Sequence, residues 1–309
     1  FTNGTFELLQ VQLTEINLLG THHQAAVNFF YDPNTIAVGG TLIVPRVWDS
    51  RLRFVGDING IVNHKTGAVE GSYGQFSYSK PLFSLASDWA YGARIAWRTD
   101  VRRRYIGPEV SLFDADKQQC VQRRDPLTGE SRIGIPCQHS RDIQVGSISV
   151  TRSLGRDIKH NVALSLEANR RVFRTGDLSE YDPAVAEDFQ KRFPPVSDTR
   201  LGPALRYQTF SAKYARVLDF DRLGLQEEYQ LGHNLVLKLS PAFAPLRESR
   251  GVVGLFAGAS YTFPLGDGLL RLYAESATDF EASGVPDGSI DVGTRLVSPR
   301  TFFGRLVFD

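Results

Sequence analysis

The sequence predicts an all-β protein: an antiparallel up-and-down transmembrane β-barrel of about 14–16 strands, either complete in these 309 residues or completed by strands outside them. Three observations predict this fold. Apolar and polar residues alternate strictly in many segments, these segments are long, and short connections alternate with long ones. The whole chain, residues 1–309, is expected to form one barrel domain.

The stretch Trp89–Arg98 shows the alternation most clearly. Successive side chains of a strand point to opposite faces, so alternate residues form two sets. One set has aromatic ends and an apolar middle, and the other holds small residues and arginine: Trp89, Tyr91, Ala93, Ile95 and Trp97 against Ala90, Gly92, Arg94, Ala96 and Arg98. In a membrane barrel the first set faces lipid, with tryptophans at both water interfaces, and the arginines face the lumen.

Segments with this period of two recur along the chain and are separated by turn residues such as Asp32-Pro33-Asn34. Two long loops interrupt them, at about 100–141 and 175–198, and the second contains one expected helix, Pro183–Phe193, with Asp182 as its N-cap. No crossover helices separate the strands, which favours an antiparallel meander. The expected strands are 5–16, 22–31, 35–44, 51–59, 69–80, 89–98, 142–154, 161–169, 200–215, 228–242, 251–263, 268–279, 288–298 and 301–309.

A soluble β-sandwich is the alternative architecture, and three features favour the barrel over it. Many segments have the length of a tilted spanning strand, about 9–11 residues. Both long loops fall on the same side of the strands, as in outer-membrane barrels. Charges also occupy mid-strand positions on one face, which a sandwich would expose to solvent. These expected lumen-facing residues are Arg53, Arg94, Arg98, Glu167, Lys238, Arg271, Glu275, Asp291 and Arg295, and the expected interface aromatics are Trp48, Trp89 and Trp97.

Composition narrows the function classes. The 35 basic and 34 acidic residues nearly balance, so no field of one sign is present to bind nucleic acid. Of the basic residues 28 are arginine, which suits lumen networks, although a genome rich in G and C gives the same bias. The six histidines form no close-spaced ligand set, and no nucleophile motif occurs. We therefore expect no metal, no cofactor and no enzymatic activity.

The two cysteines, Cys120 and Cys137, lie in the same polar loop. Two cysteines in one loop favour a disulfide formed in an oxidising compartment. A metal site is the alternative, and only His139 lies close enough in sequence to join it.

The first hundred residues resemble the barrel of the BamA/TamA outer-membrane assembly-factor family, the bacterial surface-antigen family. The resemblance lies in the order of five motifs: Asn17-Leu18-Leu19-Gly20, Asp32-Pro33-Asn34, Pro45-Arg46-Val47-Trp48, Ser50-Arg51-Leu52 and Lys80-Pro81-Leu82. A weaker echo occurs at Gly293–Pro299 and Gly304–Phe308. The resemblance implies an outer membrane of a Gram-negative bacterium, contact with its lipids, and client outer-membrane proteins and periplasmic partners.

The sequence departs from the family in two ways. The hallmark V-R-G-[FY] loop is absent, the nearest string being Asp221-Arg222-Leu223-Gly224, and no periplasmic repeat domain precedes the strands. Either the barrel is divergent, or the chain is a segment and the hallmark loop lies beyond Asp309, which we favour. Two functions follow: insertion or translocation of other outer-membrane and surface proteins, or a passive pore or structural barrel. A soluble β-sandwich that acts as a binding module is the third hypothesis.

Overall fold

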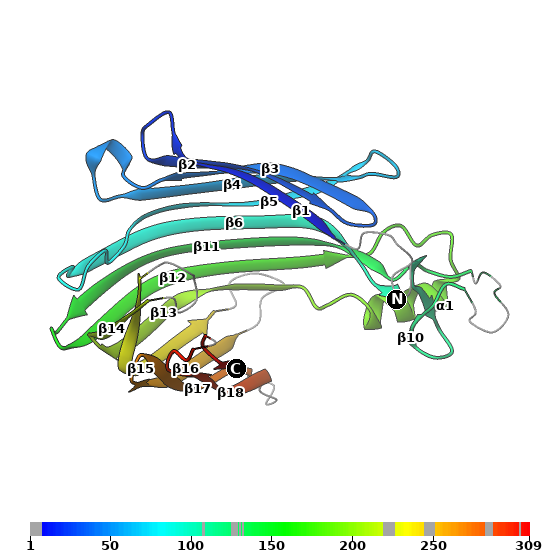
Figure 1. Cartoon of the computed structure of the whole chain (residues 1–309). Coiled ribbons are helices and arrows are strands. Elements are labelled where there is room, and N and C mark those ends of the chain that lie inside the picture. The colour runs from blue at the N-terminus through cyan, green and yellow to red at the C-terminus, as the bar shows by residue number, and fades with distance from the viewer. Residues whose placement is uncertain are drawn as a thin grey trace. The chain divides into compact units, whose positions relative to one another are not determined.

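The structure, a computed structural model, describes residues 8–106, 109–124, 129, 131, 133–218, 226–243, 251–281, 287–302 and 304–309. The string Asp221-Arg222-Leu223-Gly224 lies outside these residues. The described chain is mostly β-strand, with one α-helix (Figure 1). Its elements are β1 (Leu9–Leu18), β2 (His23–Tyr31), β3 (Thr35–Val44), the 3₁₀ turn η1 (Val47–Asp49), β4 (Arg53–Asn63), β5 (Val69–Lys80), β6 (Trp89–Arg103), β7 (Tyr105–Ile106), β8 (Glu109–Val110), β9 (Leu112–Asp114), β10 (Gln119–Val121), β11 (Gln138–Leu154), β12 (Ile158–Arg174), α1 (Pro183–Arg192), β13 (Asp198–Ser211), β14 (Lys213–Leu218), β15 (Gln226–Ala242), β16 (Val252–Leu265), β17 (Gly268–Glu281), β18 (Asp287–Val297) and β19 (Val307–Phe308).

One large sheet contains the long strands in chain order. Its hydrogen-bonded path is β1-β2-β3-β4-β5-β6-β11-β12-β13-β15-β16-β17-β18-β19, with β14 paired beside β15. The meander predicted from the alternation is therefore confirmed as a sheet of fourteen strands along one path. Several strands extend beyond their predicted ends, and β11 and β12 reach 17 residues each.

Two compact units divide the chain, and each is described by itself. The first comprises Phe1–Tyr78, Arg94–Gly146 and Asn169–Thr199, and the second Ser79–Ala93, Ser147–Ala168 and Arg200–Asp309. The first unit thus holds β1–β5 and both long loops, and the second holds β13–β19.

In the first unit, the register of β1–β4 separates two faces. Thr41 of β3 lies opposite Ala26 of β2 and Asp57 of β4, and Gly39 lies opposite Asn28 and Asn59. This face is polar or small. Directly opposed residues also form the second face, which is apolar: it contains Val11, Leu13, Val27, Phe29, Val38, Leu42 and Ile58. The alternation predicted from sequence is therefore continuous across four strands.

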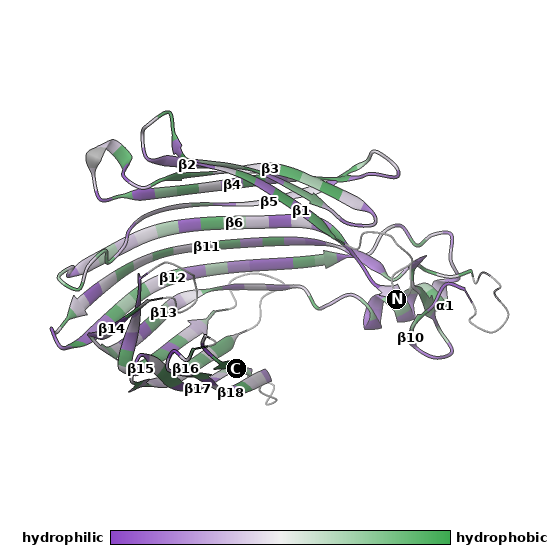
Figure 2. Cartoon of the chain, in the orientation of Figure 1, coloured by the Kyte–Doolittle hydropathy of each residue, from purple (hydrophilic) through white to green (hydrophobic). Residues whose placement is uncertain are grey.

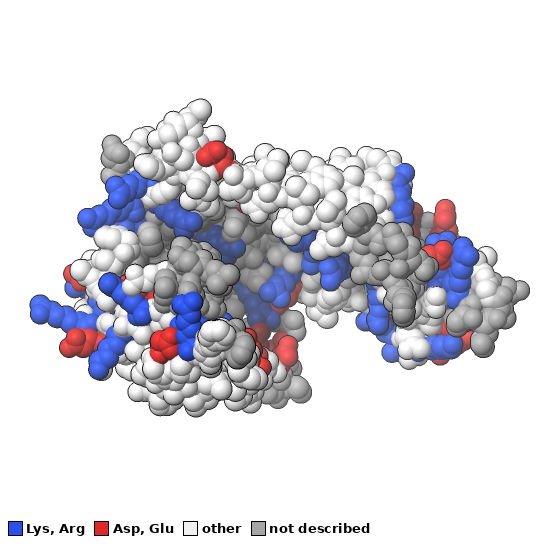
Figure 3. Space-filling view, viewed as in Figure 1, with Lys and Arg blue, Asp and Glu red and all other residues white. Residues whose placement is uncertain are grey.

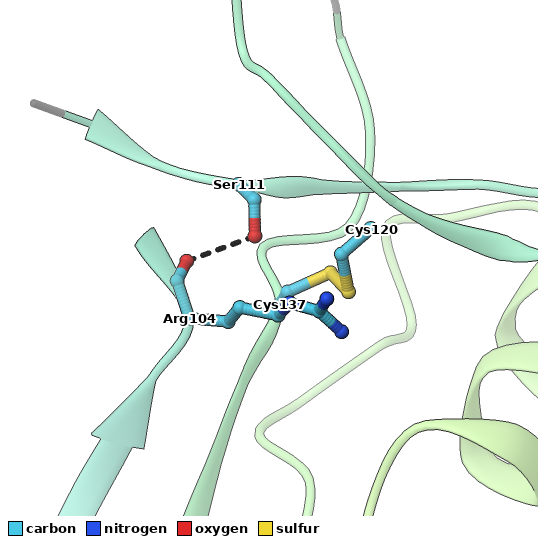
Figure 4. The surroundings of a disulfide bond; sticks show 4 residues. All are labelled: Arg104, Ser111, Cys120 and Cys137. Carbon is cyan, nitrogen blue, oxygen red and sulfur yellow. Dashed lines mark hydrogen bonds between the residues drawn. A yellow bond between two sulfur atoms is a disulfide. The ribbon is translucent and has the colours of Figure 1, made fainter. Parts of the chain in front are cut away.

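The two long loops of the first unit fold together into a cap. The disulfide between Cys120 and Cys137 is present, as predicted (Figure 4). Beside it, the Ser111 hydroxyl donates to the Arg104 carbonyl oxygen at 2.8 Å. Around the disulfide lies a small apolar core that draws on both loops: Phe113, Cys120, Ile135, Cys137, Ala186 and Phe189.

Helix α1 packs the second loop against this core. Asp182 caps the helix, as predicted, because its carboxylate accepts from the backbone N–H of Ala184 at 2.8 Å. The ring of Phe189 is 1% exposed and meets Phe113 edge to face, with ring centroids 5.3 Å apart. The predicted irregular loop at 100–141 therefore has structure of its own, β7–β10, whose two- and three-residue strands are too short to show a period.

In the second unit, β13 and β15–β18 show the same two faces. Leu205, Leu239 and Leu255 lie in one row on the apolar face. Arg206 and Lys238 are opposite each other on the polar face. The predicted strand at 301–309 is wrong for its first half, because Thr301 and Gly304 close a turn there and pairing to β18 begins only at Val307.

Candidate functional site: the polar face of the strands

The burial of side chains on the sheet is inverted relative to a soluble protein. On the apolar face of the first unit, Val27, Val38 and Ile58 are 58%, 53% and 51% exposed. On the opposite face Asn59 is 1% exposed and Asn28 7%. Soluble proteins bury aliphatic side chains and expose amides. Figure 2 shows apolar and polar bands alternating along the strands, and in Figure 3 the surface over β2 and β3 is almost free of charged atoms.

The buried polar residues of β2–β4 form a connected chain of hydrogen bonds. Asn28 Nδ2 donates to Thr41 Oγ1 at 3.0 Å, and the Thr41 hydroxyl donates to Asp57 Oδ1 at 3.1 Å. Asn59 Nδ2 donates to the same Asp57 oxygen at 3.0 Å. Gly39 makes room for this arrangement, since a Cβ there would lie 2.3 Å from Asn59 Oδ1. These hydrogen bonds offset the burial of Asn28 and of Asn59 Nδ2, whereas Asn59 Oδ1 is buried without a hydrogen-bond partner among the described residues.

Asp100 is the centre of a charged cluster at the end of β6. Arg98 Nε donates to Asp100 at 2.7 Å, and Arg141 of β11 donates to it through both Nε and Nη2. Asp100 is only 7% exposed, so two guanidinium groups compensate one buried carboxylate. The sequence predicted Arg98 as a polar-face residue but not its partners, since Arg141 is 41 residues away from Asp100.

The structure places Arg94 and Arg53 on the same polar face. Arg94 Nε donates to Gln75 of β5 at 3.1 Å. Arg98, four residues further along β6, lies over the ring of Tyr73 with 4.9 Å between its guanidinium carbon and the ring centroid. Arg53 is exposed and shares its side of β4 with Asp57. These arginines therefore line one surface without forming a single compact site.

In the second unit, Glu167 and Lys238 come together. Lys238 Nζ donates to Glu167 Oε2 at 2.8 Å, and Ser165 donates to the other oxygen of the same carboxylate at 3.0 Å. Both residues were predicted for the polar face from sequence, but their pairing was not.

The remaining predicted charges of the second unit face residues of the same sign. Arg271 of β17 lies directly opposite Arg295 of β18, and Glu275 lies directly opposite Asp291. Like charges directly opposite each other destabilise a strand pair. Arg295 also has a contact of opposite sign, since its Nε lies 3.4 Å from Asp309 Oδ1.

The three tryptophans have different surroundings. Trp89 is half exposed, and the guanidinium carbon of Arg152 lies 4.9 Å from its ring centroid. Trp97 lies across Gly74, and its Nε1 donates to Ser72 Oγ at 3.1 Å. Trp48 is 92% exposed in the β3–β4 turn, with φ +47°. Each has an apolar body beside a polar or open side, which suits an interface between lipid and water.

Two strands at the ends of the path have open edges within the described part of the chain. β1 is paired with β2 on one side only. β18 is paired along its length with β17, whereas β19 covers its second side only at Leu296 and Val297. Open edges present unpaired backbone N–H and C=O groups to other polypeptides.

Two further properties of the described residues bear on chemistry. No group of three or more His, Cys, Asp or Glu side chains is arranged to hold a metal ion there. No helix among those residues has the length and apolar character needed to cross a membrane.

Comparison of the chain with protein-family models, with curated proteins and with solved structures finds no match. The family resemblance therefore rests on the sequence motifs alone.

Proposed function

We propose that the sheet is a β-barrel of a bacterial outer membrane and that it inserts or translocates other outer-membrane proteins. The observation that supports the membrane is the inverted burial of the strands. Exposed side chains such as Val38, Ile58 and Leu237 would contact lipid, and the buried polar residues would face the lumen.

Strand length agrees with this location. β1, β3 and β4 have 10, 10 and 11 residues, and a tilted strand needs about 9–11 to cross the hydrocarbon core. β11 and β12 are longer, with 17 residues each, and lead toward the disulfide cap. The extra residues of these strands would extend beyond the bilayer. The cap, which has its own apolar core, would then lie outside the membrane.

The resemblance of the first hundred residues to assembly-factor barrels supports insertion as the activity. A client strand entering the membrane needs a partner for its backbone groups, and an unpaired edge provides one. A weakly closed seam beside β1 or β18 would supply this edge and thin the bilayer near it. Gln10 and Gln12 of β1 lie opposite Phe30 and Asn28, on the polar face of this strand pair.

Depletion of the protein tests this activity. If it is an assembly factor, the amounts of other outer-membrane β-barrel proteins should fall before growth stops, while periplasmic proteins stay constant. Unchanged amounts of these proteins after depletion would contradict insertion.

A passive pore is the second candidate, and the charged polar face favours it. Glu167–Lys238 and Arg98–Asp100–Arg141 are networks suited to a water-filled lumen. Steady ion conductance in planar bilayers, together with unchanged outer-membrane proteins after depletion, would support the pore over the assembly factor.

A further inference from the structure

The beginning of β6 carries two aromatic side chains on the apolar face of the sheet. Trp89 and Tyr91 are two residues apart, so both rings point to the same face, and they are 50% and 47% exposed. The chain enters the first long loop only at the other end of β6, after Arg103. In the proposed barrel the two rings therefore lie at the water interface next to the short turns.

Two cations from neighbouring strands converge on these rings. β6 lies between β5 and β11 in the sheet (Figure 1). From β5, Lys80 places its Nζ 5.8 Å from the ring centroid of Tyr91, and from β11, Arg152 places its guanidinium carbon 4.9 Å from that of Trp89. Because the two ring-bearing residues are about 7 Å apart along β6, the two charged groups lie over adjacent positions of one strand.

The acid beside these cations leaves them with a net positive charge. Asp88 Oδ2 lies 3.4 Å from Arg152 Nη1, and the two side chains are 62% and 36% exposed, so solvent screening limits their attraction. Lys80 has no carboxylate partner among the described residues. Two cations and one acid thus make the surface over the two rings attractive to an anion.

Buried contacts hold the loop before β6 in place. Lys159 of β12 is 4% exposed and donates to the carbonyl oxygen of Leu85 at 2.8 Å. The backbone N–H of Ser153 donates to the carbonyl oxygen of Asp88 at 2.7 Å. Loop 81–88 is thereby fixed to the hairpin of β11 and β12, so the beginning of β6 and the end of β11 keep a fixed relation.

Other aromatic pairs at the same strand ends have different contacts. His160 Nδ1 and the Tyr207 hydroxyl form a hydrogen bond of 2.7 Å, and the rings of Tyr261 and Phe263 pack with centroids 4.4 Å apart. Within the described part of the sheet, no lysine or arginine lies over these four rings. The converging cations therefore distinguish one place on the apolar face, where β5, β6 and β11 meet.

We propose that this surface binds the phosphate group of an anionic phospholipid, such as phosphatidylglycerol, in the leaflet next to the short turns. The ammonium and the guanidinium donate to the phosphate oxygens. The acyl chains lie along Ile148 and Val150, which share the parity of Arc152's position on β11 and are 57% and 40% exposed. These side chains favour a lipid over a free phosphate, because only a lipid gains from contact with them.

The inference rests on the membrane location in the proposed function and not on insertion. It adds to that location a lipid class, a leaflet and the two side chains that select the headgroup. A zwitterionic headgroup carries its own ammonium beside the phosphate, whereas an anionic one leaves the phosphate charge to Lys80 and Arg152. The surface should therefore prefer the anionic lipid, and salt should weaken the preference.

Quenching of Trp89 fluorescence by brominated lipids tests the proposal on the full chain reconstituted in vesicles. The chain has three tryptophans, so Trp48→Phe with Trp97→Phe leaves Trp89 as the reporter. The vesicles mix phosphatidylglycerol with phosphatidylcholine, and the bromine is carried by one lipid or by the other. Phosphatidylglycerol should be enriched beside Trp89 about fivefold over its share of the bilayer.

Charge variants in this background separate the two cations from general surface attraction. Lys80→Gln and Arg152→Gln should each lower the enrichment about threefold to fivefold. Asp88→Asn should raise it, because the acid beside Arg152 is removed. Arg156→Gln is the matched control, since Arg156 is exposed in the turn that follows β11 at the same end of the strands. It should change the enrichment less than Arg152→Gln.

Equal quenching by the two brominated lipids would overturn the proposal, as would an effect of Arg156→Gln as large as that of Arg152→Gln. Loss of the enrichment on adding inorganic phosphate equimolar to the phosphatidylglycerol would overturn it as well, because the surface would then bind a free anion. Failure of the membrane location gives a different result. If neither brominated lipid quenches Trp89, the membrane barrel is wrong, whereas equal quenching by both contradicts the lipid selectivity alone.

Discussion

Lys238 of β15 reaches across β13 to Glu167 of β12, with 2.8 Å between Nζ and Oε2. The pair spans two strand intervals, and the intervening strand carries the small residue Ala204, which is 1% exposed, on the face of Arg206. A larger side chain there would separate the two charges. The polar face is thus organised by charges that pair with one another over small residues.

Breaking this ion pair should lower the free energy of unfolding by a small but measurable amount. Both side chains are about one third exposed, 39% for Glu167 and 32% for Lys238, so screening limits their coupling to about 0.5–1 kcal/mol. A double-mutant cycle with Glu167→Ala and Lys238→Ala, followed by urea unfolding in detergent, measures it. The more exposed pair Arg216–Glu228, 70% and 56%, is the control and should show a smaller coupling. Equal coupling in both pairs would contradict an organising role for Glu167–Lys238.

A charge on the apolar face should block membrane insertion. Val38→Lys places an ammonium among exposed aliphatic side chains near the middle of β3, at a cost of about 2–4 kcal/mol in a bilayer. Val196→Lys is the matched control, because Val196 is 71% exposed in the loop between α1 and β13. Folding into lipid vesicles, measured by protease protection, should fall for Val38→Lys alone. Equal yields for both variants would indicate that the Val38 face meets water.

The alternation of apolar and polar residues predicted the strands, because a period of two is kept wherever each face of a strand meets one environment along its length. It failed in the cap, where Leu112–Asp114 and Gln119–Val121 are held by the disulfide and by Phe189 from another loop. Helix α1 was predictable because its cap, Asp182 followed by Pro183, is local.

The sequence predicted on which face of its strand each candidate residue lies, but it did not predict the residue that each one contacts. Parity along a strand assigns Arg98 and Glu167 to the polar side, but their partners Arg141 and Lys238 come from strands distant in sequence. The like-charge pair Glu275–Asp291 likewise depends on the register between β17 and β18, which no single strand encodes.

Removing the disulfide should loosen the cap and leave the sheet intact. Cys120 and Cys137 enclose 17 residues by separation, and such a closure contributes about 3 kcal/mol. Hydrogen exchange of α1 should accelerate in the Cys120→Ser, Cys137→Ser double variant, because Phe189 packs against the core that the disulfide closes. Exchange in β3 serves as the internal control. Unchanged protection of α1 would show that Phe113 and Ile135 hold the helix without the disulfide.

Acid should release the segment after β18 from the turn between β16 and β17. The backbone N–H of Arg300 donates to Asp267 at 3.1 Å and, with the Arg305 guanidinium, holds the pKa of that carboxyl below 3.8, the ordinary value of an aspartate. A lowered pKa in the folded state means that the ionised carboxyl stabilises this contact above the unfolded pKa, and the contribution is lost as pH falls through the folded pKa. The amide chemical shift of Arg300 should titrate with a midpoint below 3.8, and Asp267→Asn should abolish the titration. A midpoint at or above that value would contradict the contact.

Electrophoresis of the native protein tests the membrane-spanning sheet most directly. Outward exposure of Val27, Val38 and Ile58 predicts that the protein leaves the membrane fraction only with detergent. It also predicts that the unheated protein migrates differently from the heated one, because a closed barrel resists dodecyl sulfate until it is boiled. Extraction by buffer alone, with the same mobility before and after heating, would contradict a membrane barrel.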